Sequence, residues 1–140
     1  MANLSQTAAN VALGSQSTRT RIVQAGEAVT QGMPVYISTA DGKAYQSDAN
    51  ASAIAAACDG IAVTPAATDG YFVMALPGSG SKLNVGATLT VGQTYTVSAT
   101  KGAICPIADL TTGDFPTILG IASTTALLNF EVQSGGVAKP

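Results

Sequence analysis

Residues 26–37 read GEAVTQGMPVYI, and residues 86–97, sixty positions later, read GATLTVGQTYTV. The match extends without a gap over residues 26–63 and 86–123, with glycines recurring at turn positions. An internal repeat of this kind is typical of a fold built from two copies of one unit, although a chain rich in Gly, Ala and Thr also produces chance matches. A copy of roughly 40 residues rarely buries enough surface alone, so we expect the two copies to share one core.

Apolar positions recur in the same register as the glycines. The shared apolar pairs are Val29 with Leu89, Val35 with Tyr95 and Ile37 with Val97, and both copies end in a Gly-Ile-Ala triplet, residues 60–62 and 120–122. In a strand, alternate residues point to opposite faces of the sheet, so a shared apolar register predicts a shared set of inward-facing side chains.

From residue 21 onward the chain consists of short β-type runs separated by glycine. The expected strands are residues 21–25, 34–39, 43–47, 60–64, 71–76, 82–85, 88–91, 94–99, 102–107, 117–123 and 127–133. Short strands at even spacing favour an all-β fold, a compact β-sandwich or barrel of jelly-roll-like type built from two similar β-units. We therefore predict one β domain over residues 21–136, with the Ala-rich stretch 49–58 as a loop of at most one helical turn.

The composition excludes several classes of function. Only 10% of the residues are charged, the formal net charge is −2, and there is no histidine. The chain therefore lacks the usual general base and the usual zinc ligand, and we expect no enzyme, no catalytic or metal-binding residue and no cofactor. Few basic and aromatic residues argue against a nucleic-acid partner. No membrane span or signal peptide is recognisable, so we expect a soluble, cytosolically made protein with Cys58 and Cys105 as free thiols.

Several of these segments resemble the capsid decoration, or cement, proteins of tailed bacteriophages. The resemblance rests on residues 26–37, on Asp41-Gly42-Lys43-Ala44-Tyr45, on residues 89–95 and on the two Gly-Ile-Ala triplets, and it covers about residues 22–133. It implies an all-β structural protein of the virion, usually a homotrimer, which binds the outer capsid surface and clamps neighbouring major capsid subunits. Such a protein is made in the host cytoplasm.

A glycan-binding or receptor-binding β module of a phage tail or fibre is the alternative function. Tyr36, Tyr45, Tyr71 and Tyr95 are the aromatic side chains available for it. Their scattering through strand-like runs favours rings packed on the sheet over a sugar platform.

Residues 1–20 are polar and small, with no helical or strand period, and we interpret them as an extended N-terminal arm outside the core. The candidate capsid contacts are its apolar residues and the basic pair that follows: Leu4, Val11, Leu13, Arg19 and Arg21. We expect such an arm to order when it pairs with a strand edge of the capsid or of a neighbouring protomer. The alternative is a disordered tail without a role.

Overall fold

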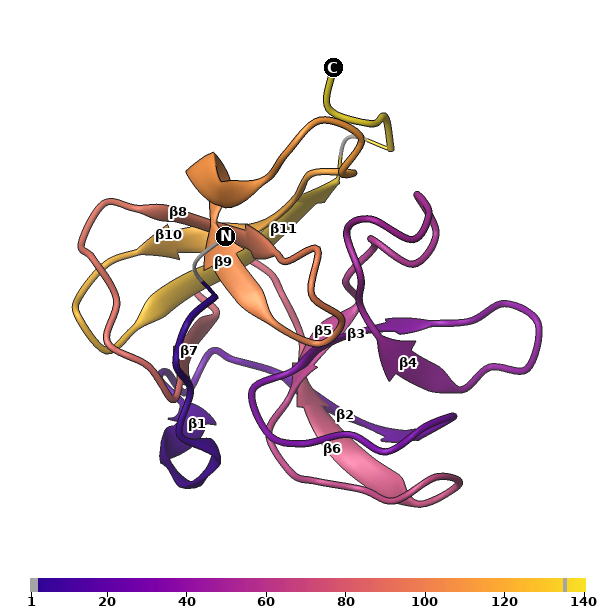
Figure 1. Cartoon of the computed structure of the whole chain (residues 1–140). Coiled ribbons are helices and arrows are strands. Elements are labelled where there is room, and N and C mark those ends of the chain that lie inside the picture. The colour runs from indigo at the N-terminus through magenta and orange to yellow at the C-terminus, as the bar shows by residue number, and fades with distance from the viewer. Residues whose placement is uncertain (1–2, 135) are drawn as a thin grey trace.

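The computed structural model describes residues 3–134 and 136–140 and is all-β, as the spacing of the expected strands predicts (Figure 1). The strands of the described chain are β1 Val11–Leu13, β2 Thr20–Gln24, β3 Pro34–Ile37, β4 Ala44–Gln46, β5 Gly60–Ala62, β6 Tyr71–Ala75, β7 Lys82–Val85, β8 Thr94–Val97, β9 Ile104–Pro106, β10 Thr117–Ala122 and β11 Leu128–Ser134. Two single-turn 3-10 helices, η1 (Ala8–Asn10) and η2 (Ile107–Asp109), complete the elements.

The strands form two antiparallel sheets that repeat one strand order. Strands β2 to β6, which we name unit 1, form a five-stranded sheet in the order β2-β6-β5-β3-β4. Strands β7 to β11, unit 2, follow the same order as β7-β11-β10-β8-β9, and β1 adds a sixth strand beside β7. Figure 1 shows unit 2 in orange and yellow beside unit 1 in purple and pink. The two units therefore share their connectivity.

The pairing of β3, β4 and β5 in unit 1 is repeated by β8, β9 and β10 in unit 2 at a shift of sixty. In unit 1 Pro34 pairs with Ile61 across β3 and β5, and in unit 2 Thr94 pairs with Ile121 across β8 and β10. The hairpins β3–β4 and β8–β9 follow the same register. The shared apolar positions are inward-facing in both units, with Val29, Leu89, Val35, Tyr95 and Val97 buried and Ile37 partly buried.

The core consists of two hydrophobic clusters instead of the single shared core that we expected. Phe72 and Met74 belong to the cluster inside unit 1, whereas unit 2 has its own cluster around Leu119 and Phe130. Ile61 and Ala75 of unit 1 belong to the cluster of unit 2. Because side chains alternate along a strand, β5 and β6 bury one face in each cluster, and the two units are joined through that sheet.

Unit 1 closes on itself like a small barrel. Ala25, directly after β2, forms a parallel bridge with Ala44 of β4, and the amide of Gly26 donates a hydrogen bond of 2.8 Å to the Ala44 carbonyl. Gly26 lies against the ring of Tyr45, where an added Cβ would be 2.3 Å from the ring. A residue without a side chain therefore permits the closure.

The N-terminal arm closes unit 2, which corrects our interpretation of residues 1–20 as lying outside the core. In the 60-residue register Gly86 and Ile104 correspond to Gly26 and Ala44, but the arm lies between them. The Leu4 amide donates to the Ile104 carbonyl at 2.8 Å, and the Thr7 amide donates to the Gly86 carbonyl at 2.6 Å. β1 then pairs with β7. The open edges of unit 2 supply backbone hydrogen-bonding groups, so the arm finds its partner within its own chain.

Two local predictions have different outcomes, and one strand was not predicted. Residues 88–91, expected as a strand, form a loop. In this loop the Leu89 amide donates a hydrogen bond to the Thr125 carbonyl, but no strand pairs with the segment. Residues 49–58 form turns, with one helix-like bond from the Ala56 amide to the Ser52 carbonyl, as expected. β1 was missed because three residues are too few to show a period.

The hairpin that joins β8 and β9 docks on unit 1. The Gly102 amide donates to the Ser47 carbonyl at 2.9 Å, and Lys101 Nζ lies 2.6 Å from Glu27 Oε1. The hairpin that joins β3 and β4 is its counterpart, and nothing lies within 4 Å of a Cβ added to Gly42 at its tip. Of these two equivalent hairpins, one therefore has its tip docked on the other unit, whereas the glycine at the tip of the other has open space around it.

Candidate interaction surfaces

The structure divides the five candidate contact residues into two groups. Leu4 is partly buried and packs against the cluster of unit 2, and Val11 of β1 is buried, with 8% of its surface exposed. Leu13 is 44% exposed, and Arg19 and Arg21 are exposed at the beginning of unit 1. Leu4 and Val11 thus hold the arm on its own chain, which leaves Leu13 and the two arginines accessible.

Gln6 of the arm connects the two units. Its side-chain amide donates to the carbonyl of Gly32 in unit 1 at 2.9 Å and to the carbonyl of Val85 in unit 2 at 2.8 Å. Gly32 has a φ of +88°, and a Cβ there would lie 2.7 Å from the Gln6 amide nitrogen. The sequence pattern of the arm gave no sign of this role, because a single amide has no period.

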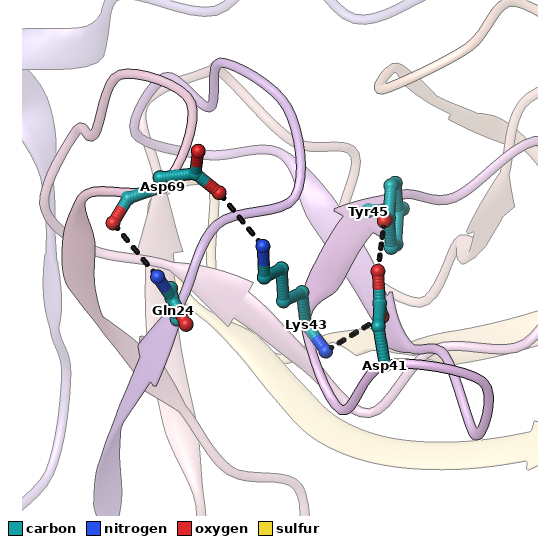
Figure 2. Close-up of polar contacts among 5 residues, drawn as sticks. All are labelled: Gln24, Asp41, Lys43, Tyr45 and Asp69. Carbon is teal, nitrogen blue, oxygen red and sulfur yellow. Dashed lines mark hydrogen bonds and ion pairs between the residues drawn. The ribbon is translucent and has the colours of Figure 1, made fainter.

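A polar cluster connects the β3–β4 hairpin to the loop before β6 (Figure 2). Lys43 Nζ lies 2.8 Å from Asp69 Oδ1, and the Asp69 carbonyl accepts a bond from the side-chain amide of Gln24. On the other side of Lys43, Asp41 accepts bonds from the Lys43 amide and from the Tyr45 hydroxyl. These bonds fix the hairpin and its neighbouring loop.

The hydrogen bonds of this cluster shift three pKa values, and each shift favours the protonation state in which the bond forms. The Tyr45 hydroxyl and the Lys43 amide, by donating to Asp41, lower the pKa of that carboxyl below 3.8. The same bond raises the pKa of the Tyr45 hydroxyl, because ionisation would remove the donor beside a carboxylate. The hydrogen bond and the charge of Asp69 raise the pKa of Lys43. None of these shifts moves a group toward neutral pH, where it would exchange protons.

Both cysteines are buried and free. Burial raises the pKa of the Cys58 thiol to about 12, and its Sγ donates to the Gly60 carbonyl. Burial likewise raises the pKa of Cys105, whose sulfur lies 3.6 Å from the Thr96 hydroxyl. Since the thiolate is the reactive species, the surroundings of both thiols suit packing and not nucleophilic chemistry.

The four tyrosines of the alternative glycan-binding function have different environments. Tyr95 is buried, and its hydroxyl accepts a bond from the Thr90 amide. Tyr36 and Tyr45 are partly buried neighbours with ring centroids 6.0 Å apart, and the Tyr45 hydroxyl is occupied by Asp41. Tyr71 is 69% exposed on β6.

The outer face of unit 2 contains a groove of about 240 Å³. Its lining residues are Thr94, Ile118, Gly120, Ile121, Asn129, Glu131 and Gln133, all on β8, β10 and β11. The register shifts between Ile118 and Gly120, a β-bulge, and Gly120 has no side chain to fill the space. A second hollow, of about 440 Å³, lies beside the arm, and none of its lining residues is charged. These residues are Ser5, Thr7, Asn10, Asn84, Gly86, Ala87, Thr88, Thr125 and Ala126.

The sequence did not reveal which apolar side chains on the strands are exposed, because their spacing is the same as that of buried residues. Ile22 is 70% exposed on β2, and Ile121 is 49% exposed on β10. Ile61, which occupies the same position as Ile121 in the repeat, is fully buried. The Gly-Ile-Ala triplet therefore predicts a strand without deciding which of its faces is covered.

Among the described residues, no group of three or more His, Cys, Asp and Glu side chains could hold a metal ion. The described part of the chain also contains no helix of the length and hydropathy required to cross a membrane. Comparisons of the chain with protein-family models, with curated proteins and with solved structures find no match.

Proposed function

We propose that this protein is a structural component of a tailed-bacteriophage particle, where it decorates and stabilises the outer capsid surface by binding across neighbouring major capsid subunits as a homotrimer. The observation that carries the proposal is the presence of exposed apolar side chains on the strands of both sheets, Ile22 and Tyr71 on unit 1 and Ile121 on unit 2. A contiguous exposed apolar patch on a sheet face is typical of a surface that contacts another protein.

The low charge of the sheet surface supports the same proposal. Of the residues in the six strands of sheet β1-β7-β11-β10-β8-β9, only Lys82 and Glu131 are charged. Interfaces have few charged residues at their centre, because each desolvated charge costs free energy unless it finds a partner. The resemblance of residues 22–133 to decoration proteins gives this contact surface its proposed partner, the major capsid protein.

A binding experiment tests the proposal. The purified protein is mixed with undecorated shells, assembled from the major capsid protein of the same genome, and the shells are recovered by sedimentation. We expect saturable binding, density on the outside of the shells in electron micrographs, and shells that resist higher temperatures. A glycan array carried out in parallel distinguishes the alternative, because glycan binding without shell binding would indicate a tail or fibre module.

A further inference from the structure

β2 and β7 hold the same position in the two sheets, each at the beginning of the shared strand order. β1 covers the outer edge of β7 and pairs Ala12 with Asn84 in antiparallel register. The Gly14 amide donates to the Lys82 carbonyl at 2.8 Å, and the Lys82 amide donates to the Thr18 hydroxyl at 2.8 Å. The backbone groups of Lys82 and Asn84 therefore point to the arm, while those of the residues between and beside them point to β11.

The same edge of unit 1 is uncovered. Among the described strands β2 pairs only with β6, apart from the closing bridge at Ala25 beyond its end (Figure 1). The Leu76 amide donates to the Arg19 carbonyl at 2.8 Å, so the backbone groups of odd-numbered residues point to β6. Those of Thr20 and Ile22 point the other way, where no strand of the described chain lies, and both residues are exposed. We name these outward N–H and C=O groups the β2 edge.

The repeat shows what an edge of this kind binds. Ile22 lies sixty residues before Lys82, and its backbone N–H and C=O point outward as the groups of Lys82 do when they bond to the arm. A row of unpaired N–H and C=O groups at the edge of a sheet pairs readily with a further strand. The β2 edge therefore fits an extended segment, in the place that β1 occupies on unit 2.

Two arginines determine which segment fits best. Arg19 directly precedes β2 and Arg21 lies within it, and both are exposed and outside the ion pairs of the described chain. Both lie on the opposite side of β2 from Ile22, because side chains alternate along a strand. An added strand would place one residue beside each arginine and one beside Ile22. Two carboxylates at alternate positions and an apolar residue next to one of them match this arrangement.

No segment of this chain offers that pattern. Residues 1–18 of the arm contain no Asp or Glu. Glu131 is the only carboxylate in a strand of the described chain, and its strand β11 is paired on both sides, with β7 and β10. Two β2 strands paired with each other would bring the arginines of both copies together, which is unfavourable. The segment that fits the β2 edge therefore belongs to a different protein.

We propose that the β2 edge binds an extended acidic segment of a different protein, which adds to the sheet of unit 1 as an antiparallel strand. Backbone bonds to Thr20 and Ile22 hold the segment, and carboxylates beside Arg19 and Arg21 select it. The inference goes beyond the proposed function, because that function rests on side chains of the sheet faces and this inference rests on the backbone of an edge.

A peptide titration tests the β2 edge. The probe is a synthetic peptide with capped ends that contains the sequence Val-Glu-Thr-Glu, and it is added to the isotopically labelled full-length protein. We expect saturable NMR shifts centred on the amides of Thr20 and Ile22. Hydrogen exchange of the Ile22 amide should become slower, because this amide gains an acceptor. A peptide in which lysines replace both glutamates should bind at least about fivefold more weakly.

A matched pair of variants separates the backbone from the side chain. Ile22→Pro removes the outward N–H without removing a bond to β6, and proline is tolerated at such positions of edge strands. Ile22→Ala shortens the same side chain and keeps the N–H. We expect Ile22→Pro to lose peptide binding and Ile22→Ala to weaken it no more than about fivefold.

Charge reversal gives an independent measurement. Arg21→Glu should reverse the preference, so that the lysine peptide binds more tightly than the glutamate peptide. Lys82→Glu, on the strand whose edge the arm covers, is the control and should leave binding of both peptides unchanged. Circular dichroism and melting temperature confirm that each variant is folded.

Several results would overturn the inference: no saturable shifts, shifts centred on other strands, equal binding of the two peptides, or binding retained by folded Ile22→Pro. A slowly exchanging Ile22 amide in the protein without peptide would also overturn it, because the edge would already be covered. Shell binding without peptide binding would leave the decoration role and remove this inference, and the reverse result would do the opposite.

Discussion

Gly26 and Gly86 occupy the same position in the two units, sixty residues apart, and they have different neighbours. Gly26 bonds directly to Ala44, which closes unit 1, whereas Gly86 bonds to Thr7 of the arm. Small residues, Ala25 and Ala44, meet where unit 1 closes, while Val85 and Ile104 occupy the corresponding positions of unit 2. In unit 2 the arm lies between these two edges and bonds to both of them. The difference teaches that one strand order can be completed locally or by a segment distant in sequence.

The largest expected effect concerns Gly60 and Gly120, the glycines that precede the buried Ile61 and the half-exposed Ile121. A Cβ at Gly120, where φ is +155°, would lie 1.8 Å from the Asn129 carbonyl oxygen, and a Cβ at Gly60 would lie 2.7 Å from the Ala75 oxygen. Gly120→Ala should cost about 3 kcal/mol or more of the free energy of unfolding, and Gly60→Ala about 1–3 kcal/mol. Urea unfolding measures both, and an equal cost would contradict the distinction between the two units.

The next effect tests whether the arm is part of unit 2. Val11 is buried and packs over both units, with its side chain 3.0 Å from a Cβ added at Gly86 and 3.1 Å from one at Gly32. Val11→Ala should lower the free energy of unfolding by about 1.5 kcal/mol, because it removes about two buried methylene equivalents. Leu13→Ala on the same strand, at a residue that is 44% exposed, is the control and should cost less than about 0.5 kcal/mol. If Val11→Ala leaves the free energy of unfolding unchanged, the arm is a tail outside the core.

The tips of the β3–β4 and β8–β9 hairpins offer a matched pair of glycines. Gly42 and Gly102 have similar φ values of +72° and +77°, but only a Cβ at Gly102 meets a neighbour, Gln46 Oε1 at 2.5 Å. Both alanine variants should lose about 1–2 kcal/mol through the left-handed backbone. Gly102→Ala should lose up to about 1 kcal/mol more, because the hairpin tip must shift away from unit 1. Equal unfolding midpoints would show that the docking adds nothing.

The smallest effect is the pH dependence of the Asp41–Tyr45 bond, which exists only in unit 1. The pKa of Asp41 is lowered, so its stabilisation is fully present above the unfolded value near 3.8 and is lost as the pH falls through the folded pKa. The pKa of Tyr45 is raised above its usual value of 10, so the stabilisation by this bond is fully present below pH 10 and is lost as the pH rises through the higher pKa of the folded state. In Tyr45→Phe, an NMR titration should show the pKa of Asp41 moving upward. An unchanged titration would mean that the Lys43 amide alone holds the carboxylate.

Much of the fold was predictable from residues 26–63 and 86–123. Glycines and alternating apolar residues placed the hairpins β3–β4 and β8–β9 correctly, because both signals act between neighbours in the chain. Residues 88–91 alternate like a strand, but they have no strand beside them, and a β-type run becomes a strand only when a partner accepts its hydrogen bonds.

Of the five candidate contact residues, the structure leaves Leu13, Arg19 and Arg21 exposed and covers Leu4 and Val11 within their own chain. Arg19 and Arg21 are exposed, since an arginine is rarely buried without a partner, and their role as contacts stays a prediction. Leu4 and Val11 were assigned to a partner protein because no periodic pattern connected them to a core. Their neighbours, Ile104 and Val85, are dozens of residues away, so only the folded chain could show the contact.

Ile61 and Ile121 separate what the sequence by itself determined from what the tertiary structure decided. Both isoleucines stand in the same triplet, both lie on a strand, and both pair with the equivalent residue of the neighbouring strand, as the repeat predicts. One is fully buried and the other is 49% exposed, although the Gly-Ile-Ala triplet itself is the same. Backbone conformation and strand pairing follow from residues close in the chain and from the period of two. Burial depends on whether another layer covers that face of the sheet, and here the layer over Ile61 is a unit that begins about twenty residues further along the chain.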